Sequence, residues 1–133
     1  MQHQVQASST STAYRVTLSD PQGHQWHADE PAEAGGGGTA PTPFQLLLSA
    51  LGACTTVTLQ MYANRKQWPL TGIQVDLQLN PQGTPSSGNL IERRIRLSGE
   101  LDDEQRQRLL QIAQDCPVHK ILAGEIQIQS HLI

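Results

Sequence analysis

The sequence contains one long helical pattern, over residues 43–66, and this pattern constrains the fold more than any other feature. No Asp, Glu, Lys or Arg lies between Phe44 and Asn64, so nearly the whole circumference of the helix is apolar, small or neutral. A helix of this kind is buried on most sides rather than on one face. Since a chain of 133 residues can hardly enclose so long a helix alone, we expect a second copy of the chain to cover the rest.

Both ends of this helix carry local signals. Thr42, Pro43 and Gln45 supply an N-cap, a proline at the first helical position and the glutamine of a capping box. The basic pair Arg65 and Lys66 suits the negative end of the helix dipole. Neutral polar side chains are spread through the helix, whereas a membrane span needs a more continuous apolar run. The sequence therefore predicts a helix over residues 43–66 that does not cross a membrane.

Shorter patterns predict an α+β fold around this helix. Alternating apolar residues predict a hairpin and three further strands, over residues 14–29, 73–79, 90–97 and 125–132. A second capping box, from Asp102 and Gln105, starts a helix that carries Cys116 at its end on the apolar face. The order of elements favours antiparallel pairing in a single domain over residues 14–133. The polar, uncharged residues 1–13 are expected to form a disordered tail.

Charge and composition exclude several kinds of partner. With 9 Lys+Arg against 12 Asp+Glu, the net charge of −3 leaves no basic surplus for a phosphate backbone or an anionic membrane surface. Only 4% of the residues are aromatic, so platforms for stacking bases are scarce. Nucleic acid is therefore not an expected partner. The first thirteen residues lack the apolar stretch of a secretory signal, so we expect a cytoplasmic, reducing location.

The two cysteines, Cys54 and Cys116, are far apart in the sequence, unlike the ligands of a zinc knuckle or the thiols of a Cys-x-x-Cys redox site. Each lies on the apolar face of a predicted helix. Two packed helices can bring Cα atoms into the range of about 4.4–6.8 Å that a disulfide needs. Since free cysteine is often simply buried, the pattern alone leaves two structural thiols and a functional pair both open.

Four other residues are candidates for a role beside the thiols. Arg93 lies on the apolar side of a predicted strand, where it either points inward or extends its charged head to water at the sheet rim. His119 follows Cys116 by three positions and either tunes a thiol or serves as an ordinary cap. Arg15 and Glu30 can approach the thiols only through folding. A metal site would need further ligands at suitable spacing, so no bound metal or cofactor is expected.

Two motifs resemble the OsmC/Ohr family, namely TPFQLLLSALGACT at residues 42–55 and CPVH at residues 116–119. The Gly-rich loop before the first motif, together with residues 29–31 and residues 61–70, resembles the OsmC-like branch of that family. The similarity covers about residues 14–133. The two cysteine motifs, at this separation and in this order of elements, are the specific part of the match.

The resemblance implies an intertwined homodimer with the long cysteine-bearing helices at its centre and antiparallel sheets around them. It also implies a thiol peroxidase of oxidative-stress defence. By this analogy Cys54 attacks a hydroperoxide and becomes a sulfenic acid, and Cys116 condenses with it to a disulfide. An external dithiol, for which the resemblance suggests a dihydrolipoyl group, then reduces the disulfide. The alternative is a non-enzymatic dimer whose thiols are structural and which binds a small apolar molecule beside Cys54.

The sequence departs from the family pattern at two places that concern the thiolate. Phe44 stands where the best-characterised peroxidase branches have a glutamate, and no Arg or Lys lies between Arg15 and Arg65, so the Gly-rich loop cannot supply a cation. A cysteine in an apolar helix without a nearby cation should have a raised pKa. An activating group for Cys54 would then have to come from Arg15, Arg93 or His119.

Overall fold

The computed structural model describes residues 2–133 of the chain. The chain gathers into two compact units, the first ending at Leu47 and the second running from Leu48 to Ile133. The boundary falls inside the long helix, a division that the sequence did not predict. Helices and two antiparallel sheets together make an α+β fold, as the sequence predicted.

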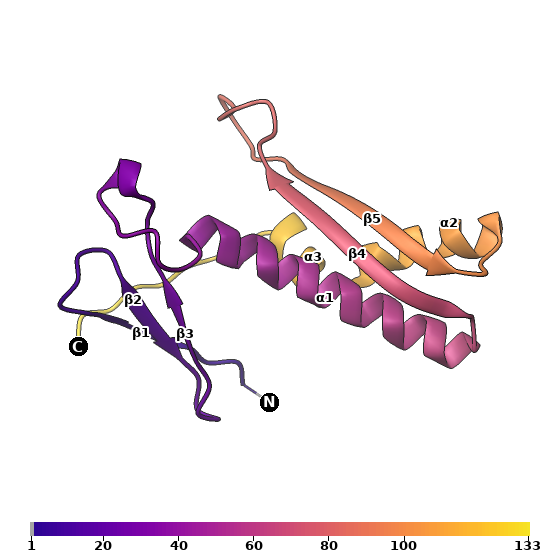
Figure 1. The fold of residues 1–133 in the computed structure, drawn as a ribbon, viewed down its shortest axis with the longest axis horizontal. Coiled ribbons are helices and arrows are strands. Elements are labelled where there is room, and N and C mark those ends of the chain that lie inside the picture. The colour runs from indigo at the N-terminus through magenta and orange to yellow at the C-terminus, as the bar shows by residue number, and fades with distance from the viewer. Residues whose placement is uncertain (1) are drawn as a thin grey trace. The chain divides into compact units, whose positions relative to one another are not determined.

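The first unit contains a three-stranded antiparallel sheet in the order β1-β2-β3 (Figure 1). Its strands are β1 Gln6–Ser9, β2 Val16–Ser19 and β3 Gln25–Ala28. The predicted hairpin is therefore confirmed as β2 and β3. The prediction of a disordered tail over residues 1–13 is wrong where β1 pairs with β2. All four side chains of β1 are exposed, so its backbone hydrogen bonds, rather than apolar burial, hold this edge strand.

The Gly-rich segment after β3 is organised around the buried carboxylate of Asp29, which is 1% exposed. This carboxylate accepts hydrogen bonds from the Glu30 amide at 2.8 Å, the Thr39 amide at 3.0 Å and the Thr39 hydroxyl at 2.7 Å. The 3₁₀ turn η1 Ala32–Ala34 lies within the loop. A Cβ on Gly36 would lie 2.0 Å from the Glu30 carbonyl oxygen, so the turn requires glycine there. The loop is thus tied to one side chain.

Replacement of Asp29 by asparagine should destabilise the fold in a pH-dependent way. The Thr39 hydroxyl, together with backbone amides and against the effect of burial, lowers the pKa of Asp29 from 3.8 to about 2. Because the loop binds the ionised form, its stabilising effect is complete above pH 3.8 and is lost as the pH falls through about 2. The melting temperature of D29N should lie several degrees below that of the native chain at pH 6, and the gap should close near pH 2.

Thermal unfolding followed by circular dichroism between pH 2 and pH 7 measures this gap. Glu33→Gln, in the same loop and exposed, is the matched control and should melt like the native chain at every pH. A gap between D29N and the native chain that stays constant from pH 6 to pH 2 would contradict the role given to the Asp29 carboxylate.

The long helix α1 Pro43–Lys66 has the bounds that the sequence predicted. Its capping box is present, because the Thr42 amide donates to Gln45 Oε1 at 3.0 Å and the Gln45 amide donates to Thr42 Oγ1 at 3.2 Å. Burial of most of its sides was expected only together with a second copy of the chain, and this stays a prediction. The buried residues form one stripe with a spacing of four, namely Leu51, Thr55, Leu59 and Ala63.

A second apolar face of α1 is left uncovered by its own chain. Leu47, Val57 and Met61 are 42%, 46% and 61% exposed, and Ala50 is exposed between them. At about 100° per residue, Ala50, Val57 and Met61 lie on the side of the helix opposite the buried stripe, whereas Leu47 continues the row of that stripe toward the start of the helix. By length and composition alone, α1 is long and apolar enough to cross a membrane. Within the structure, 22% of its most apolar 18-residue stretch is buried. The helix therefore has two apolar faces, of which its own chain covers one.

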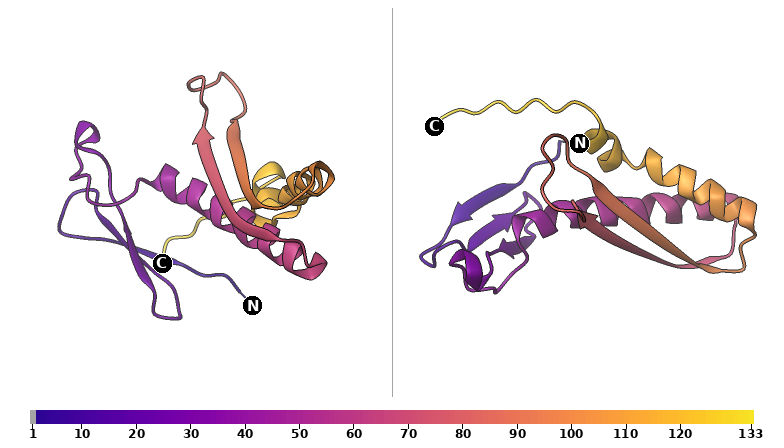
Figure 2. Two further views of the ribbon diagram at one scale, coloured as in Figure 1. Left: turned by 45° about the vertical axis from the view of Figure 1, so that its right-hand side comes forward. Right: turned by 90° about the horizontal axis from the view of Figure 1, so that it is seen from above.

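In the second unit, a long antiparallel hairpin lies along α1, with the later helices beside it (Figures 1 and 2). The strands are β4 Leu70–Leu79 and β5 Ile91–Gly99, which confirms both predicted strands. They are followed by α2 Asp103–Ile112, the 3₁₀ turn η2 Ala113–Asp115 and α3 Pro117–Ala123. The predicted capping box at the start of α2 is present. The buried core residues come from α1, α2 and the adjoining turns: Leu59, Leu101, Leu109, Ile112 and Ala113.

Arg106 of α2 joins this helix to the end of β5. Its guanidinium donates to three backbone carbonyl oxygens, those of Leu97 at 2.9 Å, Gly99 at 3.1 Å and Leu101 at 3.3 Å. These bonds satisfy carbonyl groups where the strand ends. They hold α2 against the hairpin and so set the direction of the chain toward Cys116.

The predicted final strand over residues 125–132 is wrong for the described chain. Among residues 2–133, no strand is formed after α3, and the segment extends away from the second unit's helices (Figure 2). Its apolar side chains are open to solvent, with Ile128 86% and Leu132 104% exposed. Alternating apolar residues show that a segment can form a strand, but a strand also needs a neighbour for its backbone hydrogen bonds. A single chain provides none here.

Candidate functional site

The two cysteines, predicted from separate helices, meet in the second unit. Cys54 lies midway along α1 and is half-buried, whereas Cys116 lies between η2 and α3 and is completely buried. Both are free thiols, and Cys116 lies close enough to Cys54 to affect the ionisation of that thiol. The structure thus brings the two cysteines together, and a functional pairing between them stays a prediction.

The first turn of α3 donates an amide to each sulfur. The backbone of Val118 hydrogen-bonds to Cys54, and the His119 amide donates to Cys116 Sγ at 3.4 Å. Pro117 begins this helix, and the amides of a first helical turn have no partner within their own helix. The Thr58 hydroxyl adds a further hydrogen bond to Cys54 from α1. The groups around Cys54 thus favour a negative charge on its sulfur, in a site that is mostly apolar.

Burial nevertheless raises the pKa of Cys54 above its ordinary value of 9.0. The hydrogen bond and the charge of Cys116 raise this pKa as well, while the Val118 amide and the Thr58 hydroxyl lower it. Only the thiolate form of cysteine is a strong nucleophile. Formation of the thiolate therefore depends on a cation that can offset the effect of burial on the pKa of Cys54.

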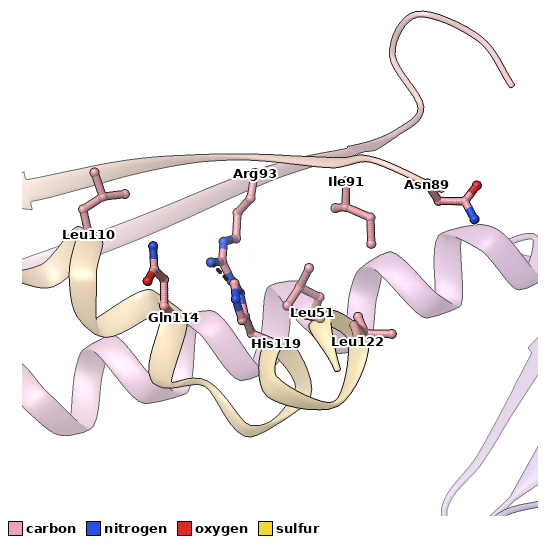
Figure 3. Close-up of a pocket in the computed structure, with 9 residues that line it drawn as sticks. Leu51, Asn89, Ile91, Arg93, Leu110, Gln114, His119 and Leu122 are labelled. Atoms are coloured by element: carbon pink, nitrogen blue, oxygen red, sulfur yellow. Dashed lines mark hydrogen bonds between the residues drawn. The ribbon is translucent and has the colours of Figure 1, made fainter. Parts of the chain in front are cut away.

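Arg93 is the cation that the structure places beside the two thiols. It lies on β5 opposite Leu77, on the face of the hairpin that is turned to α1. One Nη donates to Thr55 Oγ1 at 3.0 Å. The other bonds His119 Nδ1 at 3.0 Å (Figure 3). Burial lowers the pKa of Arg93, and the charges of Cys116 and Cys54 raise it. The alternative in which Arg93 extends to water at the sheet rim is therefore wrong.

No carboxylate neutralises this guanidinium within the part of the chain that the structure describes. Both hydrogen-bond acceptors of Arg93, the Thr55 hydroxyl and the His119 ring, are uncharged groups when they accept. The positive charge of Arg93 is thus available to the sulfur atoms.

Thr55 is a site residue that the sequence did not single out. Its side chain is completely buried, donates to the Leu51 carbonyl oxygen at 2.7 Å and accepts from Arg93. A signal was present in the sequence, because Thr55 is the polar member of an otherwise apolar stripe on α1. A buried hydroxyl needs a hydrogen-bond partner, and here the partner is the functional cation.

Two other sequence candidates occupy different surroundings. Arg15 and Glu30 belong to the first unit, where Arg15 donates to the Thr39 hydroxyl and the Glu30 amide donates to the Asp29 carboxylate. Their role beside the thiols remains a prediction. Phe44, at the position of the family's glutamate, is 66% exposed in the first turn of α1. Among residues 2–133, no three His, Cys, Asp or Glu side chains gather so that they could hold a metal ion.

A cavity of about 390 Å³ opens beside Arg93 and His119. Its other walls are mostly aliphatic, and Figure 3 shows the side chains of Leu51, Ile91 and Leu122 around the opening. The cavity thus combines an apolar lining with one guanidinium and one imidazole. A small organic molecule of mainly apolar character fits such a space.

The family model described as OsmC-like protein matches residues 35–131, a range that contains both cysteine motifs, α1 and the whole of the site. The chain belongs to the OsmC-like protein family. The resemblance drawn from residues 42–55 and 116–119 is therefore confirmed. A search of curated proteins found no match to this OsmC-like protein.

Solved structures of low sequence identity share the fold of this OsmC-like protein. An OsmC-like protein from Mycoplasma pneumoniae is 18% identical, with 93% of this chain and 89% of that chain covered and a TM-score of 0.79. An organic hydroperoxide resistance protein OsmC from Legionella pneumophila is 21% identical, with coverages of 90% and 88% and a TM-score of 0.66. An organic hydroperoxide resistance protein from Elizabethkingia anophelis is 18% identical, with coverages of 90% and 88% and a TM-score of 0.65. At these identities the likeness shows the fold alone.

Proposed function

We propose that this OsmC-like protein is a two-cysteine hydroperoxide reductase. The observation that carries the proposal is the contact between Cys54 and Cys116 beside the un-neutralised guanidinium of Arg93. Two neighbouring thiols can be oxidised together to a disulfide and reduced again, and a fixed cation stabilises the anionic form of either sulfur. The membership of the family, whose members include organic hydroperoxide resistance proteins, agrees with this chemistry.

In the first step the Cys54 thiolate attacks a hydroperoxide. A sulfur–oxygen bond forms, the oxygen–oxygen bond breaks, and the departing alkoxide takes a proton to become the alcohol. Cys54 is the attacking sulfur because it is half-buried, whereas Cys116 is completely buried. Arg93 offsets the negative charge that passes from the sulfur to the leaving oxygen.

In the second step the Cys116 thiol attacks the sulfenic acid on Cys54. A disulfide forms and the sulfenic oxygen leaves as water. The contact between the two side chains favours this condensation over further oxidation of Cys54. An external dithiol, for which a dihydrolipoyl group is our proposal, returns two electrons and two protons in the reducing cytoplasm. No bound cofactor enters this cycle.

Peroxide consumption by single-cysteine variants tests the function. With cumene hydroperoxide and dihydrolipoamide, the native chain should turn over, and without reductant it should lose the mass of two hydrogen atoms. Cys54→Ser should consume no peroxide. Cys116→Ser should consume about one equivalent and form a sulfenic acid that dimedone traps. If the native chain neither consumes peroxide nor loses two hydrogen atoms, the peroxidase is excluded.

We also propose that the working form is an intertwined homodimer. Two segments lack a covering within one chain: the outer apolar face of α1 and the extended residues 125–132. A second copy of the chain can bury the outer apolar face of α1 and supply a neighbouring strand to residues 125–132. Exposed contiguous apolar surface of this kind marks an interaction site.

The aliphatic cavity beside Arg93 favours a second candidate function. A non-enzymatic dimer could bind a small apolar molecule there, with Cys54 and Cys116 as structural thiols. In that case the native chain consumes no peroxide, and both serine variants bind a fluorescent apolar probe as well as the native chain does. The peroxide experiment therefore separates the two candidates.

A further inference from the structure

We propose that His119 is a positioning residue, whose neutral imidazole holds Arg93 against the two thiols without neutralising its charge. The role rests on the proposed function, yet thiol ionisation measures it without any peroxide. It assigns a task to the histidine of the CPVH motif. It also explains how this chain stabilises a thiolate without a cation in the Gly-rich loop.

The hydrogen bond between Arg93 and His119 defines the protonation of the ring. A guanidinium has donors only, so the Nδ1 atom that lies 3.0 Å from Arg93 must accept. The ring proton is then on Nε2, and the imidazole is neutral. Burial lowers the pKa of His119, and the charge of Arg93 lowers it further. Both effects favour the neutral, accepting form near pH 7.

Arg93 is held from two sides by acceptors that carry no charge. Thr55 uses its own proton to bond the Leu51 carbonyl oxygen at 2.7 Å, so a lone pair of its hydroxyl faces the guanidinium. His119 presents Nδ1 from α3 on the other side. A carboxylate in either place would form an ion pair and reduce the effect of the cation on the sulfur atoms. Neutral acceptors fix the position of the guanidinium and leave its charge to the thiols.

His119 is itself fixed by a bond to the neighbouring sulfur. Its backbone amide donates to Cys116 Sγ at 3.4 Å, at the start of α3. The residue therefore contacts Cys116 through its backbone and Arg93 through its ring. A substitution of the side chain leaves the amide in place, so it reports on the ring alone.

Protonation of the ring should release Arg93. An imidazolium has no acceptor at Nδ1 and repels the guanidinium. The ionisable groups around this contact are Arg93 on β5, Cys54 on α1 and Cys116 at the start of α3. Within residues 2–133 His119 forms no ion pair with a carboxylate. Acidification should thus weaken thiolate stabilisation more steeply than the titration of the thiols alone.

The test measures thiolate absorbance at 240 nm and the rate of alkylation by iodoacetamide from pH 5 to pH 10 on the reduced protein. His119→Leu should slow alkylation at pH 7.5 about tenfold, because it removes the acceptor. His119→Asn should stay close to the native rate at pH 7.5, because the Asn oxygen can accept from Arg93. It should also lose the steeper fall at low pH, because it does not titrate. His3→Leu, a change of the same kind at an exposed position, should behave like the native chain.

If His119→Leu is poorly folded, the low-pH profile of His119→Asn still tests the proposal, and a double variant tests whether His119 acts through Arg93. In the Arg93→Met background, His119→Asn and His119→Leu should each leave the alkylation rate unchanged, because His119 acts through Arg93. The proposal is wrong if H119L titrates like the native chain, if H119N is as slow as H119L, or if H119L slows the Arg93→Met variant further. If the thiols show the His119 dependence but reduce no peroxide, the proposed function fails and the positioning role stands.

Discussion

Replacement of Arg93 by methionine is expected to slow the alkylation of the reduced thiols at pH 7.5 by about tenfold or more. Methionine keeps much of the length of the side chain and removes the charge. A partly buried charge pair contributes on the order of 1–3 kcal/mol, and each ~1.4 kcal/mol corresponds to about tenfold in rate. Without the cation, burial of Cys54 is no longer offset. Peroxide reduction should fall in parallel, since it uses the same thiolate.

The pH profile distinguishes loss of the cation from general damage. In the native chain the rate should still be rising at pH 9, because burial raises the pKa of Cys54 above 9.0. The profile of R93M should move further toward alkaline pH. The matched control is Arg94→Met on the opposite face of β5, where the 79% exposed Arg94 bonds Glu92 at 2.6 Å. Equal profiles for R93M and R94M would show that Arg93 does not stabilise the thiolate.

A glutamate in place of Val57 is expected to abolish the proposed dimer at micromolar concentration. Val57 lies on the uncovered apolar face of α1 and is 46% exposed in one chain. A carboxylate buried there without a partner costs several kcal/mol, which is enough to dissociate the subunits or unfold them. Sedimentation should show a dimer for the native chain. V57E should sediment as a monomer or lose its helical circular dichroism.

Gln107→Glu adds the same negative charge at an exposed position of α2 and serves as the control. It should remain a folded dimer. A native chain that is folded and monomeric at micromolar concentration would overturn the dimer, and so would a V57E variant that sediments as the native dimer does. Recovery of the native chain with added phospholipid vesicles, rather than as a dimer, would assign the outer face of α1 to a membrane instead.

The elements that the sequence predicted correctly are those with local signals. The start of α1 depends on Thr42 and Gln45, and that of α2 on Asp102 and Gln105, within four residues in each case. Strand β1 carries no apolar pattern and exists through its pairing with β2, so no local signal could predict it. Residues 125–132 show the reverse case, since their alternation is clear and their pairing partner is missing from the single chain.

The same distinction holds within the site. The sequence placed Cys54 on an apolar helix face and Arg93 on the apolar side of its strand. Its placement of Cys116 at the end of the second helix is wrong, because α2 ends at Ile112 and Cys116 caps the start of α3. The sequence left open whether the guanidinium points inward. The alternation of side chains along a strand shows on which face Arg93 lies, but not what packs against that face. The register that sets Arg93 opposite Leu77, and the packing of that face on Thr55, decided the question.

The sequence by itself determined where the helices start, the two long strands, the family and the identity of the two thiols, because each depends on residues close together in the chain. Only the tertiary structure decided what surrounds the thiols. Arg93 reaches Thr55 across 38 positions and His119 across 26, and the backbone of Val118 reaches Cys54 only after the chain has folded back. Contacts of this kind are set by packing between elements, and a pattern along one element cannot record them.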